Sequence, residues 1–181
     1  MRKIGLLVFF FLVFLLSFSL SSPQAFAITD LSASSSSVPE VNYELPYPGL
    51  LPDSPLYFLR IIRDWSVGFL ITDPVKKSEF DLLQADKRLN AGIYLFNEGK
   101  ISLAFSTVSK AENYFGEAIS KMKEAKTEGR DVNSIKGNLM IAVKKHEEEL
   151  GILAGESDVN FKKSFQNELK IVTGFDQGLS Q

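Results

Sequence analysis

The chain has 181 residues, with 20 Lys and Arg, 22 Asp and Glu, and a net charge of −2. This balance argues against nucleic-acid binding, which needs clustered bases that neutralise phosphates. The absence of cysteine excludes disulfides, cysteine nucleophiles and cysteine-ligated zinc or iron–sulfur sites, so packing has to stabilise the fold.

The first 27 residues are typical of a secretory signal peptide. Two basic residues (2–3) precede an apolar run over 4–20, and Ala-Phe-Ala at 25–27 supplies a small-residue cleavage pattern, with no acidic residue in this part. We predict cleavage after Ala27, which leaves 154 residues with a net charge of −4. The alternative is an uncleaved membrane anchor, because the run approaches the ~18–20 residues that span a bilayer. Both outcomes predict a secreted or extracytoplasmic location.

Two segments without helical periodicity follow. Residues 28–42 include four consecutive serines and are predicted to form a flexible linker. Residues 43–54 form a proline-rich arm, in which the prolines hold the chain extended and reduce the entropy lost on ordering. We expect the apolar side chains of the arm to lie against the helices as a stiff cover. Pro52-Asp53-Ser54-Pro55 also matches a P-x-x-P ligand pattern, but helix initiation explains the prolines next to the helix equally well.

The remainder is predicted to be helical, because capping and stop residues divide it regularly. Ser54 and Asp73 each precede a proline at a first helical position, and Gly99, Gly129 and Gly174 follow helical runs as stops. The predicted helices cover residues 55–71, 74–98, 101–128, 132–154 and 159–173, with a flexible tail over 174–181.

Apolar residues recur at helical spacing in each of these segments, opposite faces that carry Lys, Glu, Ser and Asn. Connections of two to four residues require consecutive helices to fold back as antiparallel hairpins. The predicted fold class is therefore all-α, a small bundle of about five helices preceded by the proline-rich arm.

Two stretches, LLPDSPLYFLR at 50–60 and TDPVKKSEFDLLQADKRLNAG at 72–92, carry a family resemblance. They resemble the bacterial domain-of-unknown-function family numbered 5667, over about residues 43–125. The run at 85–89, Ala-Asp-Lys-Arg-Leu, departs from the A-E-R-R-L type of that family. The resemblance implies an exported or membrane-tethered helical protein and no known activity.

The sequence contains no strong pattern for catalysis, cofactor binding or metal binding. His146 is the only histidine, and a di-iron site of the ferritin type needs two Glu-x-x-His motifs. No G-x-S-x-G elbow, phosphate loop or dinucleotide G-x-G-x-x-G occurs. We therefore expect no enzyme activity, no cofactor and a structural role for His146.

Two carboxylates leave an enzymatic alternative open. Asp86 lies beside the apolar stripe of the 74–98 helix, and Glu112 lies within the stripe of the 101–128 helix. Carboxylates held together in an apolar setting could perform acid–base catalysis. The structural alternative is that each pairs with a base, Arg60 or Arg63 being the nearest candidates.

The expected function is a non-catalytic interaction or structural module at the outer face of the membrane, with a protein partner at the cell envelope. The chain itself would contact the membrane through its N-terminal segment if that segment is uncleaved. The candidate interaction surface consists of Pro46, Tyr47, Pro48, Phe58 and Trp65.

The 55–71 helix is the most ambiguous element. Phe58, Ile62, Trp65 and Phe69 form an aromatic-rich stripe, and further apolar residues lie on another side. A helix that is apolar on two sides is either packed inside a domain or lies on a membrane or partner. We predict that Trp65 packs against the second and third helices, with the arm over the other side; binding to a membrane surface is the alternative.

Overall fold

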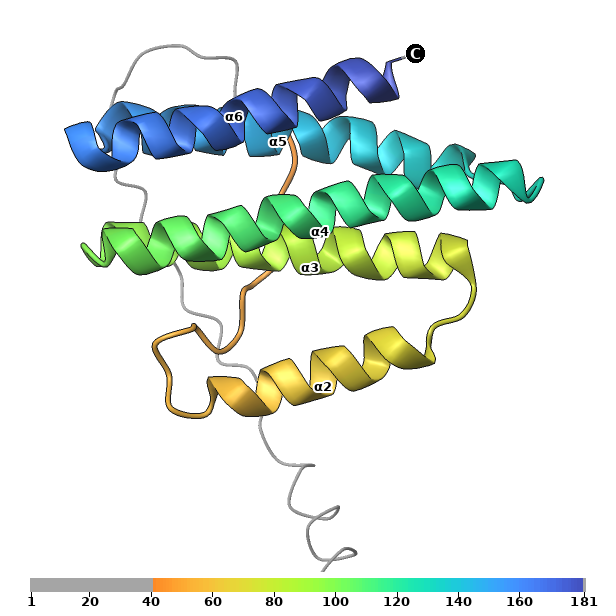
Figure 1. Ribbon diagram of the computed structural model, residues 1–181, viewed down its shortest axis with the longest axis horizontal. Helices are drawn as coiled ribbons and strands as arrows, with labels where there is room; N and C mark the ends of the chain where they lie inside the picture. Colours follow the sequence, from red (N-terminus) through yellow and green to blue (C-terminus); the bar gives the residue numbers. More distant parts are fainter. Residues whose placement is uncertain (1–40, 181) are drawn as a thin grey trace, which may run out of the picture. The chain divides into compact units, whose positions relative to one another are not determined.

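The computed structural model describes residues 41–180, and the predicted signal peptide and most of the predicted linker lie outside this range. Five helices and no strand are present among the described residues, which confirms the all-α prediction (Figure 1). In chain order they are α2 (Tyr57–Leu70), α3 (Pro74–Asn97), α4 (Ile101–Thr127), α5 (Asn133–Glu156) and α6 (Val159–Leu179).

Local signals set four of the ten helix ends. The Asp73 carboxylate accepts from the amide of Lys76, with Pro74 at the first helical position of α3. Asp158 caps α6 in the same way, through the amides of Asn160 and Phe161. Gly99 and Gly129 end α3 and α4 with φ of 76° and 75°, a left-handed conformation that glycine adopts without steric cost.

Two predicted boundaries are wrong. The first helix begins at Tyr57 rather than at residue 55, and no side chain caps it, because the Ser54 hydroxyl only accepts a long 3.4 Å bond from the amide of Leu56. The last helix continues through Gly174 to Leu179. The residues of the predicted tail are held by packing: Phe175 stacks on Phe115, and Leu179 is fully buried.

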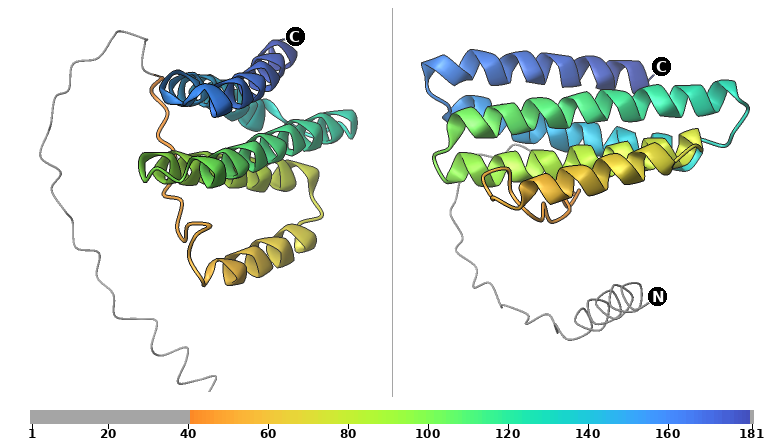
Figure 2. Two further views of the ribbon diagram at one scale, coloured as in Figure 1. Left: turned by 60° about the vertical axis from the view of Figure 1, so that its left-hand side comes forward. Right: turned by 60° about the horizontal axis from the view of Figure 1, so that its bottom comes forward.

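Four of the helices pack in pairs. α3 packs mainly against α4, and α5 against α6, while α3 also contacts α5 and α4 contacts α6. Between the pairs lies a core in which Leu89, Phe115, Leu139, Leu150 and Phe165 are fully buried. Figures 1 and 2 show α2 on the opposite side of the α3–α4 pair from α5 and α6. Among the described residues, no helix combines the length and the apolar composition that crossing a bilayer requires.

α3 and α4 approach most closely at Gly92. A Cβ at this position would lie 2.4 Å from Cγ2 of Val108 and 3.3 Å from the carbonyl oxygen of Ala104. Since a side-chain carbon cannot come so near, only glycine allows this spacing of the two helices.

The arm contacts α5 first and then α3. The amide of Val41 donates to Glu148 of α5 at 2.6 Å, the Tyr43 hydroxyl donates to Asp86 of α3 at 2.6 Å, and Asn90 of α3 donates to the carbonyl of Pro46 at 3.0 Å. These contacts include residue 41, which lies inside the predicted linker. The expected apolar cover forms only in part: Tyr43 and Leu45 pack on the core, whereas Tyr47 and Leu50 are exposed, at 76% and 44%.

Candidate functional site

The three residues that the sequence singled out for chemistry lie together inside the bundle. Asp86 comes from α3, Glu112 from α4 and His146 from α5. His146 Nε2 is 3.1 Å from Oδ1 of Asp86, and Nδ1 is 3.0 and 3.1 Å from the two carboxylate oxygens of Glu112. One imidazole thus bridges two carboxylates, and the three helices meet at this buried triad.

The triad holds its histidine in the protonated form at neutral pH. His146 is fully buried, and burial alone would lower its pKa. The Glu112 charge and the hydrogen bonds that His146 donates to both carboxylates outweigh that effect and raise the pKa of His146 to about 9. As an imidazolium it donates from both ring nitrogens, which satisfies both carboxylates.

The arm and α6 complete this polar cluster. The Tyr43 hydroxyl donates a hydrogen bond to Asp86. Burial is the main cause that raises the pKa of Tyr43, and the negative charge of Asp86 raises it further. On α6, burial raises the pKa of Glu168, and the nearby Glu112 charge adds to the effect. Hydrogen bonds therefore join the arm to α3, α4 and α5, and Glu168 of α6 lies close to this cluster.

This geometry corrects the expected partners of Asp86 and Glu112. Neither carboxylate pairs with Arg60 or Arg63; both arginines contact Asp64 of α2 instead. Within residues 41–180, neither carboxylate lines the hollow of about 380 Å³ beside the arm, which is formed by Lys145 and residues 41–44. The imidazole is sealed further by the Phe115 ring, whose centroid is 4.8 Å away.

Both ring nitrogens are committed and neither carboxylate reaches solvent, so the triad has the properties of a structural junction. In residues 41–180, no group of three or more His, Asp or Glu side chains is arranged to hold a metal ion. The imidazole lies between the two carboxylates here, so the three side chains do not converge on a common point.

The second candidate region is α2, which has inverted polarity: it buries charged side chains and exposes apolar ones. Its two buried residues are charged: Arg60 is 6% exposed and Asp64 is 7% exposed. Arg60 Nε is 3.5 Å from Asp64, and Nη1 donates to the arm carbonyls of Pro48 and, at 2.8 Å, Leu50. The arm therefore covers the polar side of α2. The large apolar side chains face outward, and nine are exposed, Leu56 just before the helix and eight within it: Phe58, Leu59, Ile61, Ile62, Trp65, Val67, Phe69 and Leu70.

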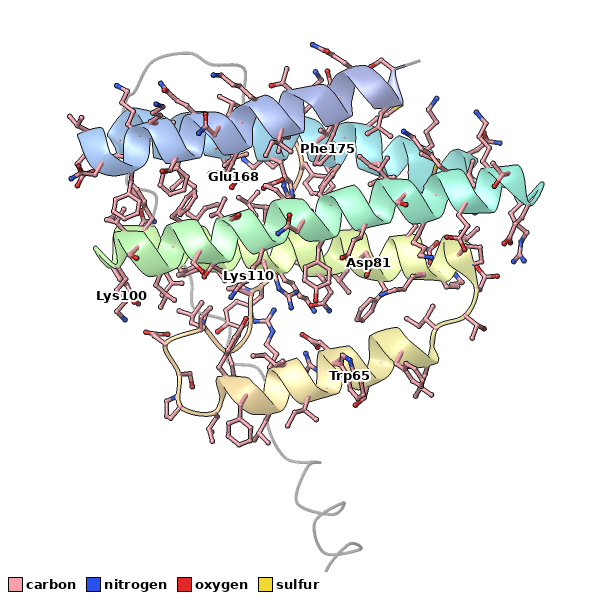
Figure 3. The ribbon with its side chains drawn as sticks, viewed as in Figure 1. Trp65, Asp81, Lys100, Lys110, Glu168 and Phe175 are labelled. Atoms are coloured by element: carbon pink, nitrogen blue, oxygen red, sulfur yellow. The ribbon has the colours of Figure 1, made fainter. Side chains whose placement is uncertain are left out.

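The prediction that Trp65 packs inside the domain is wrong, because Trp65 is 70% exposed. It stacks on Phe69, with ring centroids 6.0 Å apart, at the rim of a shallow groove that Phe80 and Tyr114 also line. Figure 3 labels Trp65 on α2, well away from the bundle core. The position on α2 that would face the bundle is taken by the Arg60–Asp64 pair and by the arm.

The predicted interaction surface divides into two groups. Tyr47, Phe58 and Trp65 are exposed, as an interaction surface requires. Pro48 is buried and Pro46 is partly buried, and their carbonyls accept hydrogen bonds from Arg60 and Asn90. These two prolines therefore fix the arm. Leu59, Ile61 and Leu70 are also exposed, although the predicted surface did not include them.

Comparison with curated proteins and with solved structures gives no match. A family model matches residues 49–152, which start inside the arm and end within α5, so the match includes the whole of α2 and all three residues of the buried triad. The matched part exceeds half of the chain, and the protein therefore belongs to the family described as a domain of unknown function, DUF5667.

Proposed function

We propose that the protein is a non-catalytic, exported module that lies on the outer surface of the membrane and binds the bilayer through the apolar face of α2. The observation that carries this proposal is the inverted polarity of α2. A helix that buries its charges and exposes its apolar side chains is unfavourable in water unless another apolar phase covers it.

The exposed face is large enough to be a binding surface. Nine large apolar side chains within residues 56–70 are each 42–76% exposed. The largest apolar patch on a typical monomer covers ~300–600 Å². Nine such side chains within 15 residues are more than the singly scattered apolar residues of an ordinary surface.

Charge and aromatic content favour a bilayer over a second protein surface. The only acidic residue of α2, Asp64, is buried, whereas Arg63 is exposed. The outward side of α2 thus carries apolar residues and a cation, which suits an anionic lipid surface. Trp65 and Phe69 are stacked on this side, and tryptophan is enriched where proteins meet the membrane interface.

The chain that precedes α2 supports the same assignment. Twenty residues separate the apolar run over 4–20 from Val41; if they form the flexible linker that the sequence predicts, their end-to-end distance is roughly 25 Å. An uncleaved segment would hold α2 within reach of lipid. In a chain cleaved after Ala27, the α2 face would be the remaining membrane contact.

Trp65 provides a direct test, since it is the only tryptophan. The full chain is reconstituted into vesicles whose acyl chains are brominated, and quenching of Trp65 fluorescence is measured. We expect a blue-shifted emission and strong quenching. As the control, Trp65→Phe/Ile171→Trp moves the fluorophore to an exposed position on α6, which should remain unquenched.

Two results would contradict the proposal. If Trp65 emission stays water-like and unquenched in vesicles, α2 does not contact lipid. If the emission shifts to the blue only as protein concentration rises, without quenching by brominated lipid, a second copy or another protein covers this face.

A further inference from the structure

A pocket of about 220 Å³ lies between the arm, α2 and α3. Four consecutive arm residues, 47–50, line one side, and the other lining residues are Arg60, Arg63 and Lys87. Three cationic side chains and no carboxylate thus form its wall. Figure 3 shows nitrogen-bearing side chains gathered between the α2 and α3 ribbons.

The positive charge of this pocket is only partly neutralised. Asp64 lies behind the wall and contacts both arginines, Arg60 at 3.5 Å and Arg63 at 2.7 Å. Lys87 is half-buried, and within residues 41–180 no carboxylate lies within ion-pair distance of it. One carboxylate against three cations leaves a net charge of +2 around the pocket.

This arrangement is costly without an anion. A partly buried ammonium loses hydration, and the loss is recovered only when an opposite charge or hydrogen-bond acceptors replace the water. Arg60 donates from Nη1 to the arm carbonyls, and its Nε lies 3.5 Å from Asp64 as an ion pair without a hydrogen bond, so Nη2 takes part in neither contact. Guanidinium groups match the oxygens of phosphate in paired hydrogen bonds, and lysine adds a point charge.

We propose that this pocket binds a phosphate-type oxyanion, held by Arg60, Arg63 and Lys87. The anion has two sources, free phosphate or the phosphodiester of an anionic lipid headgroup. The lipid source rests on the proposed membrane function: Arg63 is on the same helix as the apolar face, so a headgroup in the pocket would place its acyl chains beside Ile62 and Leu59.

Free phosphate is tested first, on the full chain in a neutral maltoside detergent. Inorganic phosphate is titrated by calorimetry, and the melting temperature is followed in parallel. Lys87→Gln should weaken binding about tenfold, the loss of about 1.4 kcal/mol, and abolish the rise in melting temperature that phosphate causes. Lys170→Gln, which removes an exposed lysine of α6, should bind phosphate as the parent chain does.

Loss of folding cannot mimic this result. Lys87 forms no ion pair in the described part of the chain, so Lys87→Gln should melt at or above the parent temperature without phosphate. Arg60 is not substituted, because its hydrogen bonds to the carbonyls of Pro48 and Leu50 hold the arm in place. If phosphate binds neither chain, or binds the parent and Lys87→Gln equally, the pocket is not a phosphate site.

Vesicles then distinguish the two sources. With a lipid headgroup in the pocket, Trp65 quenching should be stronger in phosphatidylglycerol than in phosphatidylcholine vesicles, and Lys87→Gln should remove the difference. Calorimetric binding without that difference identifies free phosphate as the ligand. If Trp65 is quenched but phosphate does not bind and Lys87→Gln has no effect, the pocket is not an anion site and the proposed membrane function still stands. If phosphate binds but Trp65 is not quenched, the anion site stands and the proposed membrane function does not.

Discussion

Raising the pH should weaken the fold through the single histidine. In the folded chain the pKa of His146 is raised to about 9, against an ordinary value of 6.5. Because the folded value is the higher one, protonation stabilises the fold. This contribution is complete below pH 6.5 and is lost as the pH rises through 9. Each pH unit between these values is worth about 1.4 kcal/mol, so the free energy of unfolding should fall by about 3 kcal/mol.

Urea unfolding followed by far-ultraviolet circular dichroism measures this loss, at pH values from 6 to 9.5. The midpoint should fall steadily while the slope with urea stays constant, since the same surface is exposed on unfolding. The range stops below the ordinary pKa of tyrosine, because Tyr43 would add an effect of the same sign above pH 10. His146→Gln should show a flat profile from a lower starting stability.

Nuclear magnetic resonance gives an independent measurement on the same protein. The chain has one histidine, so one imidazole signal should titrate near pH 9. An imidazole that titrates at or below 6.5, or a midpoint that does not change between pH 6.5 and 9, would refute the description of the triad as a charge-stabilised junction.

Four further outcomes can be measured. Gly92→Ala should cost about 1–3 kcal/mol in thermal unfolding, because its Cβ would meet Val108 at 2.4 Å; an unchanged melting temperature would show that α3 and α4 can separate freely. Trp65→Ala should cost only about 1 kcal/mol, since its side chain is mostly exposed, whereas Phe165→Ala in the core should cost about 3–5 kcal/mol; equal losses would contradict the exposed position. Intact mass of the natively exported protein should show a chain cleaved after Ala27, and a 181-residue species in the membrane fraction would identify an anchor instead. Thermal melting should be the same with and without a chelator, and a loss of several degrees on chelation would reveal a structural metal ion.

The helices could be predicted from sequence because their signals are local. Asp73 and Gly99 set helix ends through contacts within a few residues, and these predictions are confirmed. The end of α6 could not be found in this way. Gly174 resembles a stop signal, but the contacts of Phe175 and Leu179 with other parts of the bundle outweigh its low helix propensity.

The site was only partly predictable, since its contacts join residues far apart in the chain. The sequence identified Asp86, Glu112 and His146 separately, but the histidine lies 60 and 34 positions from its two carboxylates. Periodicity placed Asp86 and Glu112 near apolar stripes without showing which helices meet. For α2, periodicity indicated two apolar sides, but which side faces the bundle depends on the Arg60–Asp64 pair and its contacts with the arm.

The path of the arm has a mechanical consequence. Its contacts with α5, α3 and α2 follow one another along the extended segment. The first joins Val41 to Glu148, and the next joins Tyr43 to Asp86. Tension applied from the N-terminal side would therefore load these bonds one at a time, as in peeling, rather than all together, as in shear. The Arg60 clamp would be loaded last. A pull on the chain that precedes the arm would thus release the arm and expose Asp86 before it displaced α2.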